Sequence, residues 1–210
     1  MSRPRKARRD AEANRERLLA AAVTAMHRDG RHVPLAAIAA EAGLGIGTLY
    51  RSYPDREALL HALELRAYEL LNSLLDEIEH EDGISCLDAI ARYLEGALAV
   101  RDQLFLPLHG APPLLDPSAV EQRRRINQRL DGFLDAGRSA GAVRAPVNAT
   151  DLIIFSAVIT QPLSHGPDWD HVARRQIAVF LNGLTVEGPA DVPGPPVERG
   201  SMERTFMRHT

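Results

Sequence analysis

Residues 35–56, LAAIAAEAGLGIGTLYRSYPDR, constrain the fold of this chain more than any other segment. Apolar residues over 35–42 recur at the three- and four-residue spacing of a short helix, and a glycine at 43 then interrupts the pattern. A second short helix is predicted over 46–53, and Pro54 ends it because proline cannot extend a helix. Two short helices around a tight glycine turn are typical of a helix-turn-helix, whose second helix enters the major groove of DNA.

The second predicted helix has two faces of different character. Leu49 and Tyr53 lie four residues apart and are expected to pack on the core of this small domain. Thr48, Arg51 and Ser52 share the opposite face, where they would meet solvent or DNA. The exposed face is therefore the first place to look for DNA contacts.

Several residues around this face are candidate DNA contacts. A phosphate role is the default for each, because most protein–DNA hydrogen bonds go to the backbone. For Tyr53 a buried ring is an equally good interpretation, and for Arg56 the alternative is a solvated partner of Asp55. Gly45 is the expected N-cap, and Gly47 leaves the first turn without bulk. The full set of candidates is Gly45, Gly47, Thr48, Tyr50, Arg51, Ser52, Tyr53 and Arg56.

This segment resembles the DNA-binding motif of the tetracycline-repressor (TetR) family of bacterial transcriptional regulators. It departs from the family pattern at Gly45, Ile46 and Tyr53, where a small capping Ser, a polar or basic residue and a Phe are usual. The loss of a polar residue at Ile46 removes one potential base or phosphate contact from the first turn. The matching residues are Ile38, Ala39, Ala42, Gly43, Gly47, Thr48, Leu49, Tyr50, Pro54, Arg56 and Leu59.

The charge distribution agrees with a DNA-binding head on a different kind of body. The net charge is −3, but residues 1–60 hold 11 Lys and Arg against 7 Asp and Glu, whereas residues 61–210 hold 14 against 21. The basic excess is concentrated in residues 1–9, which are predicted to be a disordered arm. Such an arm can follow phosphates or enter the minor groove, or can simply be a solvated tail.

Composition excludes several other classes of protein. Alanine and leucine dominate and aromatic residues make up only 5%, which favours an all-α fold. No run of 18 apolar residues exists, and the single cysteine, Cys86, cannot form an intrachain disulfide, so a cytoplasmic protein without membrane association is expected. No nucleophile motif, phosphate-binding loop or metal-ligand cluster is present, so neither enzymatic activity nor a cofactor or metal is predicted.

The rest of the chain is predicted to be a larger helical domain. The expected domains are a helix-turn-helix head at 10–57, a ligand-binding and dimerisation domain at 58–185 and a disordered tail at 186–210. The helix at 148–164 is apolar on more than one face, which favours burial in a homodimer interface. Helices are predicted over about 10–28, 35–42, 46–53, 55–79, 85–100, 118–140, 148–164 and 169–184, with one more expected in the body.

The TetR resemblance implies that the body senses a small molecule whose binding weakens DNA binding. It also implies that the last two helices pair with those of a second subunit. Polar and aromatic residues of the body are the candidates for the pocket lining. They are Tyr93, Phe105, His109, Phe133, Phe155, Gln161 and His165. An aromatic residue at helical spacing is more often part of the core, and a hydrogen-bond network at a dimer interface is an alternative role for Gln161 and His165.

The sequence therefore predicts a ligand-responsive regulator. A homodimeric repressor is expected to bind a pseudo-palindromic operator, with two recognition helices about one duplex turn apart, and to be released by a small molecule of unknown identity. A transcriptional activator with the same head and a helical protein–protein interaction module remain the alternatives. The salt dependence of binding would distinguish DNA binding from the protein–protein interaction module, because DNA binding weakens steeply as salt rises.

Overall fold

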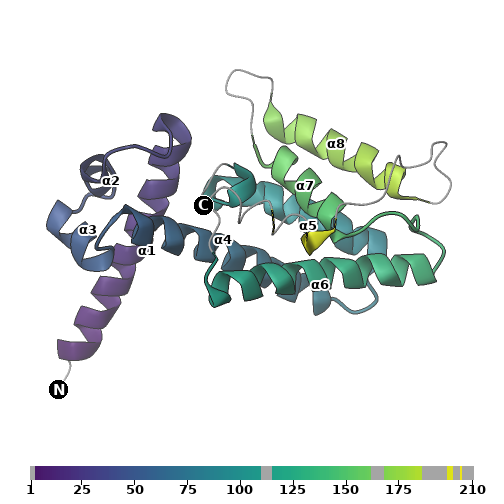
Figure 1. The fold of residues 1–210 in the computed structure, drawn as a ribbon, viewed down its shortest axis with the longest axis horizontal. Coiled ribbons are helices and arrows are strands. Elements are labelled where there is room, and N and C mark those ends of the chain that lie inside the picture. Colours follow the sequence, from purple (N-terminus) through teal and green to yellow (C-terminus); the bar gives the residue numbers. More distant parts are fainter. Residues whose placement is uncertain (1–2, 110–114, 162–167, 186–197, 201–203, 205–210) are drawn as a thin grey trace. The chain divides into compact units, whose positions relative to one another are not determined.

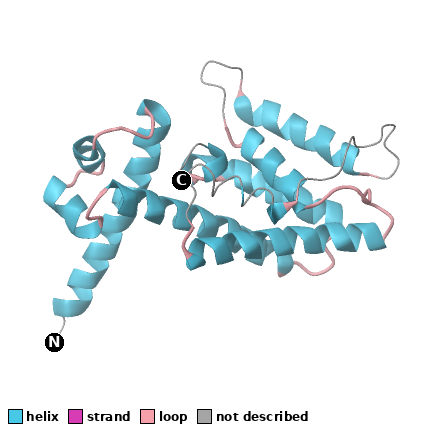
Figure 2. Cartoon of the chain, in the orientation of Figure 1, coloured by secondary structure: helices cyan, strands magenta, loops and turns pink. Residues whose placement is uncertain are grey.

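The structure is a computed structural model that describes residues 3–109, 115–161, 168–185, 198–200 and 204. These residues contain eight α-helices, and their sole β-type pairing is a bridge between Val143 and Thr185 (Figures 1 and 2). The predicted all-α fold class is confirmed.

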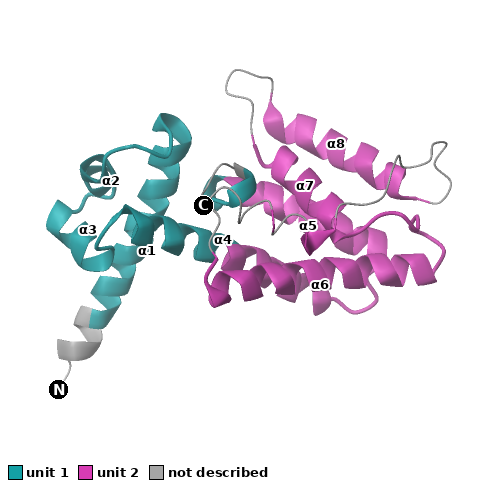
Figure 3. Cartoon of the chain, viewed as in Figure 1, with its two compact units in different colours: residues 1–67, 102–112 teal, residues 68–101, 113–210 magenta. Residues whose placement is uncertain are grey.

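The chain forms two compact units (Figure 3). Unit 1 comprises residues 1–67 and 102–112, and unit 2 comprises residues 68–101 and 113–210. The expected boundary at 57–58 is thus wrong by about ten residues, because unit 1 keeps the first half of a long helix. Unit 1 also takes a segment that follows α5 in the sequence and that was expected in the body.

Unit 1 contains α1 (Arg3–Asp29), α2 (Leu35–Glu41), α3 (Ile46–Ser52) and the beginning of α4 (Arg56–Glu79). Helix α1 begins at Arg3, so the basic arm predicted to be disordered forms the first turns of a helix. The composition of the residues before Asp10 explains the difference, because they include no glycine and only one proline. That residue, Pro4, lies in the first turn of the helix, where proline is tolerated.

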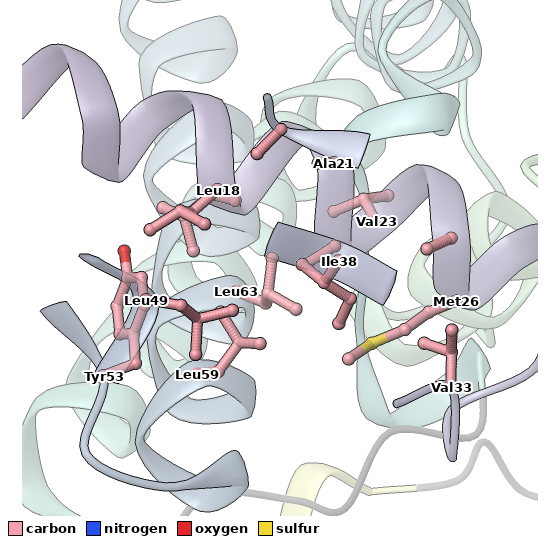
Figure 4. Close-up of a cluster of buried hydrophobic side chains, with 14 of the residues drawn as sticks. Leu18, Ala21, Val23, Met26, Val33, Ile38, Leu49, Tyr53, Leu59 and Leu63 are labelled. Carbon is pink, nitrogen blue, oxygen red and sulfur yellow. The ribbon is translucent and has the colours of Figure 1, made fainter. Parts of the chain in front are cut away.

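The core of unit 1 lies where α1, α2, α3 and α4 meet (Figure 4). The predicted inner face of the helix-turn-helix is confirmed, because Ile38 and Leu49 are fully buried. Phe105 also belongs to this cluster, although it comes from the segment after α5. The large apolar side chains of the cluster are Leu18, Leu19, Val23, Met26, Val33, Ile38, Leu49, Tyr53, Leu59, Leu63 and Phe105.

A Schellman turn closes α2 and aims the chain into α3. The amide of Leu44 donates to the carbonyl of Ala39, and the amide of Gly43 donates to that of Ala40, each over 2.9 Å. Gly43 has a φ of +65°, the left-handed conformation that the motif requires. Helix α1 secures the turn, because Nη2 of Arg17 donates to the carbonyl oxygen of Ala42 over 2.7 Å.

Unit 2 contains the second half of α4 together with α5 (Cys86–Ala99), α6 (Pro117–Ser139), α7 (Ala149–Ile159) and α8 (Trp169–Leu184). Helix α5 packs against α6 and α8, and α6 packs against α7. Between α5 and α6 lie two 3-10 turns, η1 (Arg101–Gln103) and η2 (Pro107–His109).

Local capping sets the beginnings of the helices in unit 2. Ser85 accepts a hydrogen bond from the amide of Asp88 and so starts α5, as predicted. Asn148 forms a capping box with Asp151 at the start of α7. Helix α7 ends at Ile159 rather than near residue 164, because Pro162 disfavours a helical conformation in the residue before it.

Two other expectations about the body have different outcomes. Four α-helices follow α4 in the described residues, together with the two 3-10 turns, rather than five helices. The tail predicted to be disordered at 186–210 lies mostly outside the described residues, and Arg199, Gly200 and Arg204 within it are helical.

Candidate nucleic-acid interface

Helix α3 presents a polar face to solvent while its other face anchors it. Leu49 is fully buried and Tyr53 is 3% exposed, so these two residues hold the helix against the core as predicted. On the outer face Arg51 is exposed and its Nη2 donates to Oγ1 of Thr48 over 3.0 Å. Ser52 is half-buried beside them. This bond holds the guanidinium over the exposed face, where it can donate to an incoming acceptor.

The first turn of α3 is open. Gly45 is its N-cap without a side-chain cap bond, and no atom lies within 4 Å of the position that a Cβ would occupy on Gly45 or Gly47. Ile46 and Tyr50 project from the same helix with 40% and 51% of their surface exposed. Part of the outer surface of α3 is therefore apolar.

Tyr53 is buried, as in the alternative interpretation that the sequence offered for this residue. Its ring is in the core, and the guanidinium carbon of Arg15 lies 5.5 Å from the ring centroid. Burial raises the pKa of its hydroxyl, which also bonds to Arg15. Tyr53 thus joins α3 to α1 instead of presenting a free ring to DNA.

Arg56 has a role that the sequence did not suggest. Its Nη1 donates to the carbonyl oxygen of Arg31 over 2.8 Å, and its Nη2 donates to that of Val33 over 2.5 Å. The expected alternative partner, Asp55, instead accepts a bond from the amide of Ala58 at the start of α4. Arg56 therefore ties α4 to the loop between α1 and α2.

A groove of about 490 Å³ runs between α1 and α3. The sequence analysis missed its α1 wall, which supplies Asp10, Asn14 and Arg15. The available signal was the spacing of Arg8 and Arg15, which lie seven residues apart and so share one face of the helix. The groove is lined by Asp10, Ala11, Asn14, Arg15, Thr48, Arg51 and Ser52.

The candidate ligand residues do not gather at one place. Tyr93 of α5 is buried and bonds to Ser156 of α7, and burial raises its pKa to about 12. Phe155 of α7 stacks on Phe180 of α8, with ring centroids 3.9 Å apart. Phe133 is half-buried on α6, and Gln161 is exposed just after α7.

The remaining candidates fall elsewhere. Phe105 lies in the core of unit 1, so its assignment to a pocket in the body is wrong; the reason is that the segment after α5 belongs to unit 1. The side chain of His109 and the whole of His165 lie outside the described residues.

Helices α7 and α8 carry exposed apolar side chains. Ile154 and Val158 lie one helical turn apart on α7, and Val158 is 60% exposed. Val179 of α8 is 58% exposed. All three of these exposed apolar residues belong to the last two helices of unit 2.

Among the described residues, no helix is both long and apolar enough to cross a membrane. The same part of the chain holds no group of three or more His, Cys, Asp or Glu residues placed to bind a metal ion.

Two sequence families match the chain. Residues 18–63 match the bacterial regulatory proteins of the tetR family, and residues 88–186 match the C-terminal domain of SbtR-like transcriptional regulators. The chain belongs to the TetR family. The first match contains α2 and α3 but begins after the α1 wall of the groove, and the second spans most of α5 through α8. No curated protein sequence matches this TetR-family chain.

Solved structures of other TetR-family regulators share the fold. The ketosteroid transcriptional regulator KstR2 of Mycobacterium tuberculosis is 18% identical with a TM-score of 0.66, covering 82% of this chain and 95% of that chain. A TetR transcription regulatory protein from Mycobacterium vanbaalenii is 26% identical with a TM-score of 0.58, covering 85% and 99%. AibR, in complex with isovaleryl coenzyme A and operator DNA, is 15% identical with a TM-score of 0.66, covering 82% and 98%.

Proposed function

We propose that this chain is a homodimeric repressor that binds a pseudo-palindromic operator through α3 and releases it when unit 2 binds a small organic effector. The observation that carries the proposal is the exposed face of α3, where Arg51 and Thr48 line the same groove as Arg15 of α1. The chain acts by occupying DNA rather than by catalysis.

The polar side chains of this groove suit the backbone and base edges of DNA. Arg51 is exposed and already oriented by Thr48, so it can donate to a guanine edge or to a phosphate. Arg15 is engaged with Tyr53 at one wall, and its remaining donors favour a phosphate. Tyr50, half exposed, can present its hydroxyl to a phosphate.

Two features support dimerisation. Helix α7 is apolar on several faces, and α7 and α8 expose Ile154, Val158 and Val179 within unit 2. A second copy of the same surface would cover these side chains with a two-fold symmetric interface. Two recognition helices are also what a pseudo-palindromic site requires.

An organic effector is supported by one fold neighbour, AibR, whose structure is in complex with both isovaleryl coenzyme A and operator DNA. An effector releases the DNA only if it binds the DNA-free form more tightly than the DNA-bound form.

The test begins with the full chain and random double-stranded DNA, from which repeated rounds of selection recover a bound sequence. We expect an inverted repeat, bound by two copies of the chain, with affinity that falls steeply as salt rises. Arg51→Ala should weaken binding by about 1–3 kcal/mol for each guanine edge contacted.

Arg92→Ala is the matched control, because Arg92 is an exposed arginine of unit 2 that pairs with Glu81. It should leave operator affinity unchanged. Failure to enrich any DNA sequence would refute the DNA-binding role, and an Arg51→Ala variant that binds the operator like the parent would refute the contact assigned to Arg51. Transcription in vitro from a promoter that overlaps the operator separates repression from activation.

A further inference from the structure

Part of the exposed surface of α3 is apolar, which is unusual for a surface expected to meet DNA. Ile46 is 40% exposed and Tyr50, one turn later, is 51% exposed. Single exposed apolar side chains are common on protein surfaces, so exposure alone carries no argument. The position of Ile46 carries it, because the N-terminal residues of a recognition helix are the ones that reach base edges.

Ile46 provides the only side chain at the start of α3, because both of its neighbours, Gly45 and Gly47, are glycines. Ile46 is absent from the hydrophobic cluster of unit 1, which instead takes Leu49 and Tyr53 from this helix. Its branched side chain is therefore the only one on the first two residues of α3 that can touch a bound molecule.

An isoleucine can read only one feature of a base pair in the major groove. It has no donor or acceptor, so hydrogen-bonded readout is closed to it. Thymine carries a C5-methyl group on its major-groove edge, and apolar side chains discriminate thymine through that methyl. Cytosine, adenine and guanine offer no such group at their major-groove edges.

We propose that Ile46 selects a thymine in each operator half-site by packing on its C5-methyl group. This inference rests on the proposed DNA-binding function and adds a base preference to it. Arg51 and Thr48 supply polar contacts on the neighbouring face, while Ile46 supplies an apolar one, so the two contributions can be measured separately.

The experiment deletes the methyl group from the DNA. Each symmetric pair of thymines in the selected operator is replaced by deoxyuridine, one pair at a time, and affinity for the full chain is measured by fluorescence anisotropy. For one of these pairs, the replacement should lower the affinity of the chain about fourfold per half-site, or roughly fifteenfold for the dimer. This is the loss expected for one buried methyl group at each half-site. Ile46→Ala should bind the thymine and deoxyuridine versions of that pair equally.

Two controls make the result specific. Ile46→Val keeps a branched apolar side chain and should retain most of the preference, whereas Arg51→Ala should weaken binding to both versions and leave the preference intact. Because Ile46 lies outside the buried cluster of unit 1 and is 40% exposed, its variants should change the melting temperature little.

The outcomes separate this inference from the function on which it depends. If the chain selects an operator but no thymine pair is sensitive to methyl deletion, or if Ile46→Ala keeps the sensitivity, the methyl contact is overturned and DNA binding stands. If the chain enriches no DNA sequence, the proposed function itself fails.

Discussion

Nη2 of Arg56 lies 2.5 Å from the carbonyl oxygen of Val33, and this bond fixes the start of α4 to the loop before α2. A second bond from the same guanidinium reaches the carbonyl of Arg31. An arginine that looked like a phosphate ligand in the sequence thus satisfies backbone acceptors in a loop that has few other donors.

Arg56→Ala should therefore lower the free energy of unfolding by about 1–3 kcal/mol, the usual cost of losing hydrogen bonds from a charged donor. Operator affinity measured at temperatures where the variant is folded should keep its salt dependence. A phosphate contact in each subunit would instead flatten the slope of log K against log salt by about 1.8 for the dimer. Urea unfolding and a salt titration of DNA binding decide between these outcomes.

Gly43 should be intolerant of substitution. Its φ of +65° is unfavourable for a residue with a Cβ, and that Cβ would lie 3.0 Å from Nη2 of Arg17. Gly43→Ala should destabilise the protein by about 1–2 kcal/mol. Gly132→Ala is the control, because Gly132 lies inside α6 with open space around it, and there alanine should stabilise by up to about 1 kcal/mol. Equal effects of the two changes in thermal unfolding would contradict this account of the turn.

The hydroxyl of Tyr93 should make stability depend on alkaline pH. Burial raises its pKa to about 12 in the folded chain, above the ordinary value of 10.0, so the folded state holds this proton more tightly than the unfolded state. The stabilisation is complete below pH 10 and is lost progressively between pH 10 and 12, by roughly 2–3 kcal/mol.

Tyr93→Phe isolates this effect, since it removes the titrating group and keeps the ring. The variant should be less stable at neutral pH by about 1 kcal/mol, because Ser156 loses its partner. The stability difference between parent and variant should then shrink above pH 10. Parallel chemical unfolding curves at pH 8, 10 and 11 test this, and a constant difference would show that Tyr93 titrates normally.

Val158→Glu should convert a dimer into a monomer, because it places a charge on the exposed apolar surface of α7. Leu115→Glu is the matched control, since Leu115 is also a large exposed apolar residue, 45% exposed, but lies outside α7 and α8. Sedimentation velocity should show half the mass for the first variant alone. Loss of the dimer with Leu115→Glu, or its persistence with Val158→Glu, would place the interface elsewhere.

The sequence predicted well what is decided by neighbouring residues. The apolar spacing of Ile38 and Ala39, the left-handed glycine at 43 and the caps at Ser85 and Asn148 all act within a few residues of their own position. The helical fold and the helix-turn-helix could therefore be read from local pattern, and the family match agrees with them.

What the sequence could not predict depends on contacts between distant segments. Arg17 and Ala42 are 25 residues apart, and nothing local marks an arginine in α1 as the donor that closes α2. The same holds for Arg15, which meets Tyr53 only after α1 and α3 have packed. A pattern gives the face on which a side chain lies, but the partner on that face comes from the tertiary fold.

Phe105 shows that the DNA-binding module is not an autonomous stretch of chain. Its ring fills part of the cluster formed by α1 to α4, yet 37 residues of the sequence separate it from Ala67.

 Of that intervening stretch, residues 68–101 belong to unit 2 and the last three already belong to unit 1. A gene fragment truncated after Ala67 would therefore encode the helix-turn-helix but leave a void where the ring belongs. A chimaera that joins this helix-turn-helix to another sensor domain must therefore include residues 102–109. Otherwise the cavity left by Phe105 has to be filled by redesigning the neighbouring side chains.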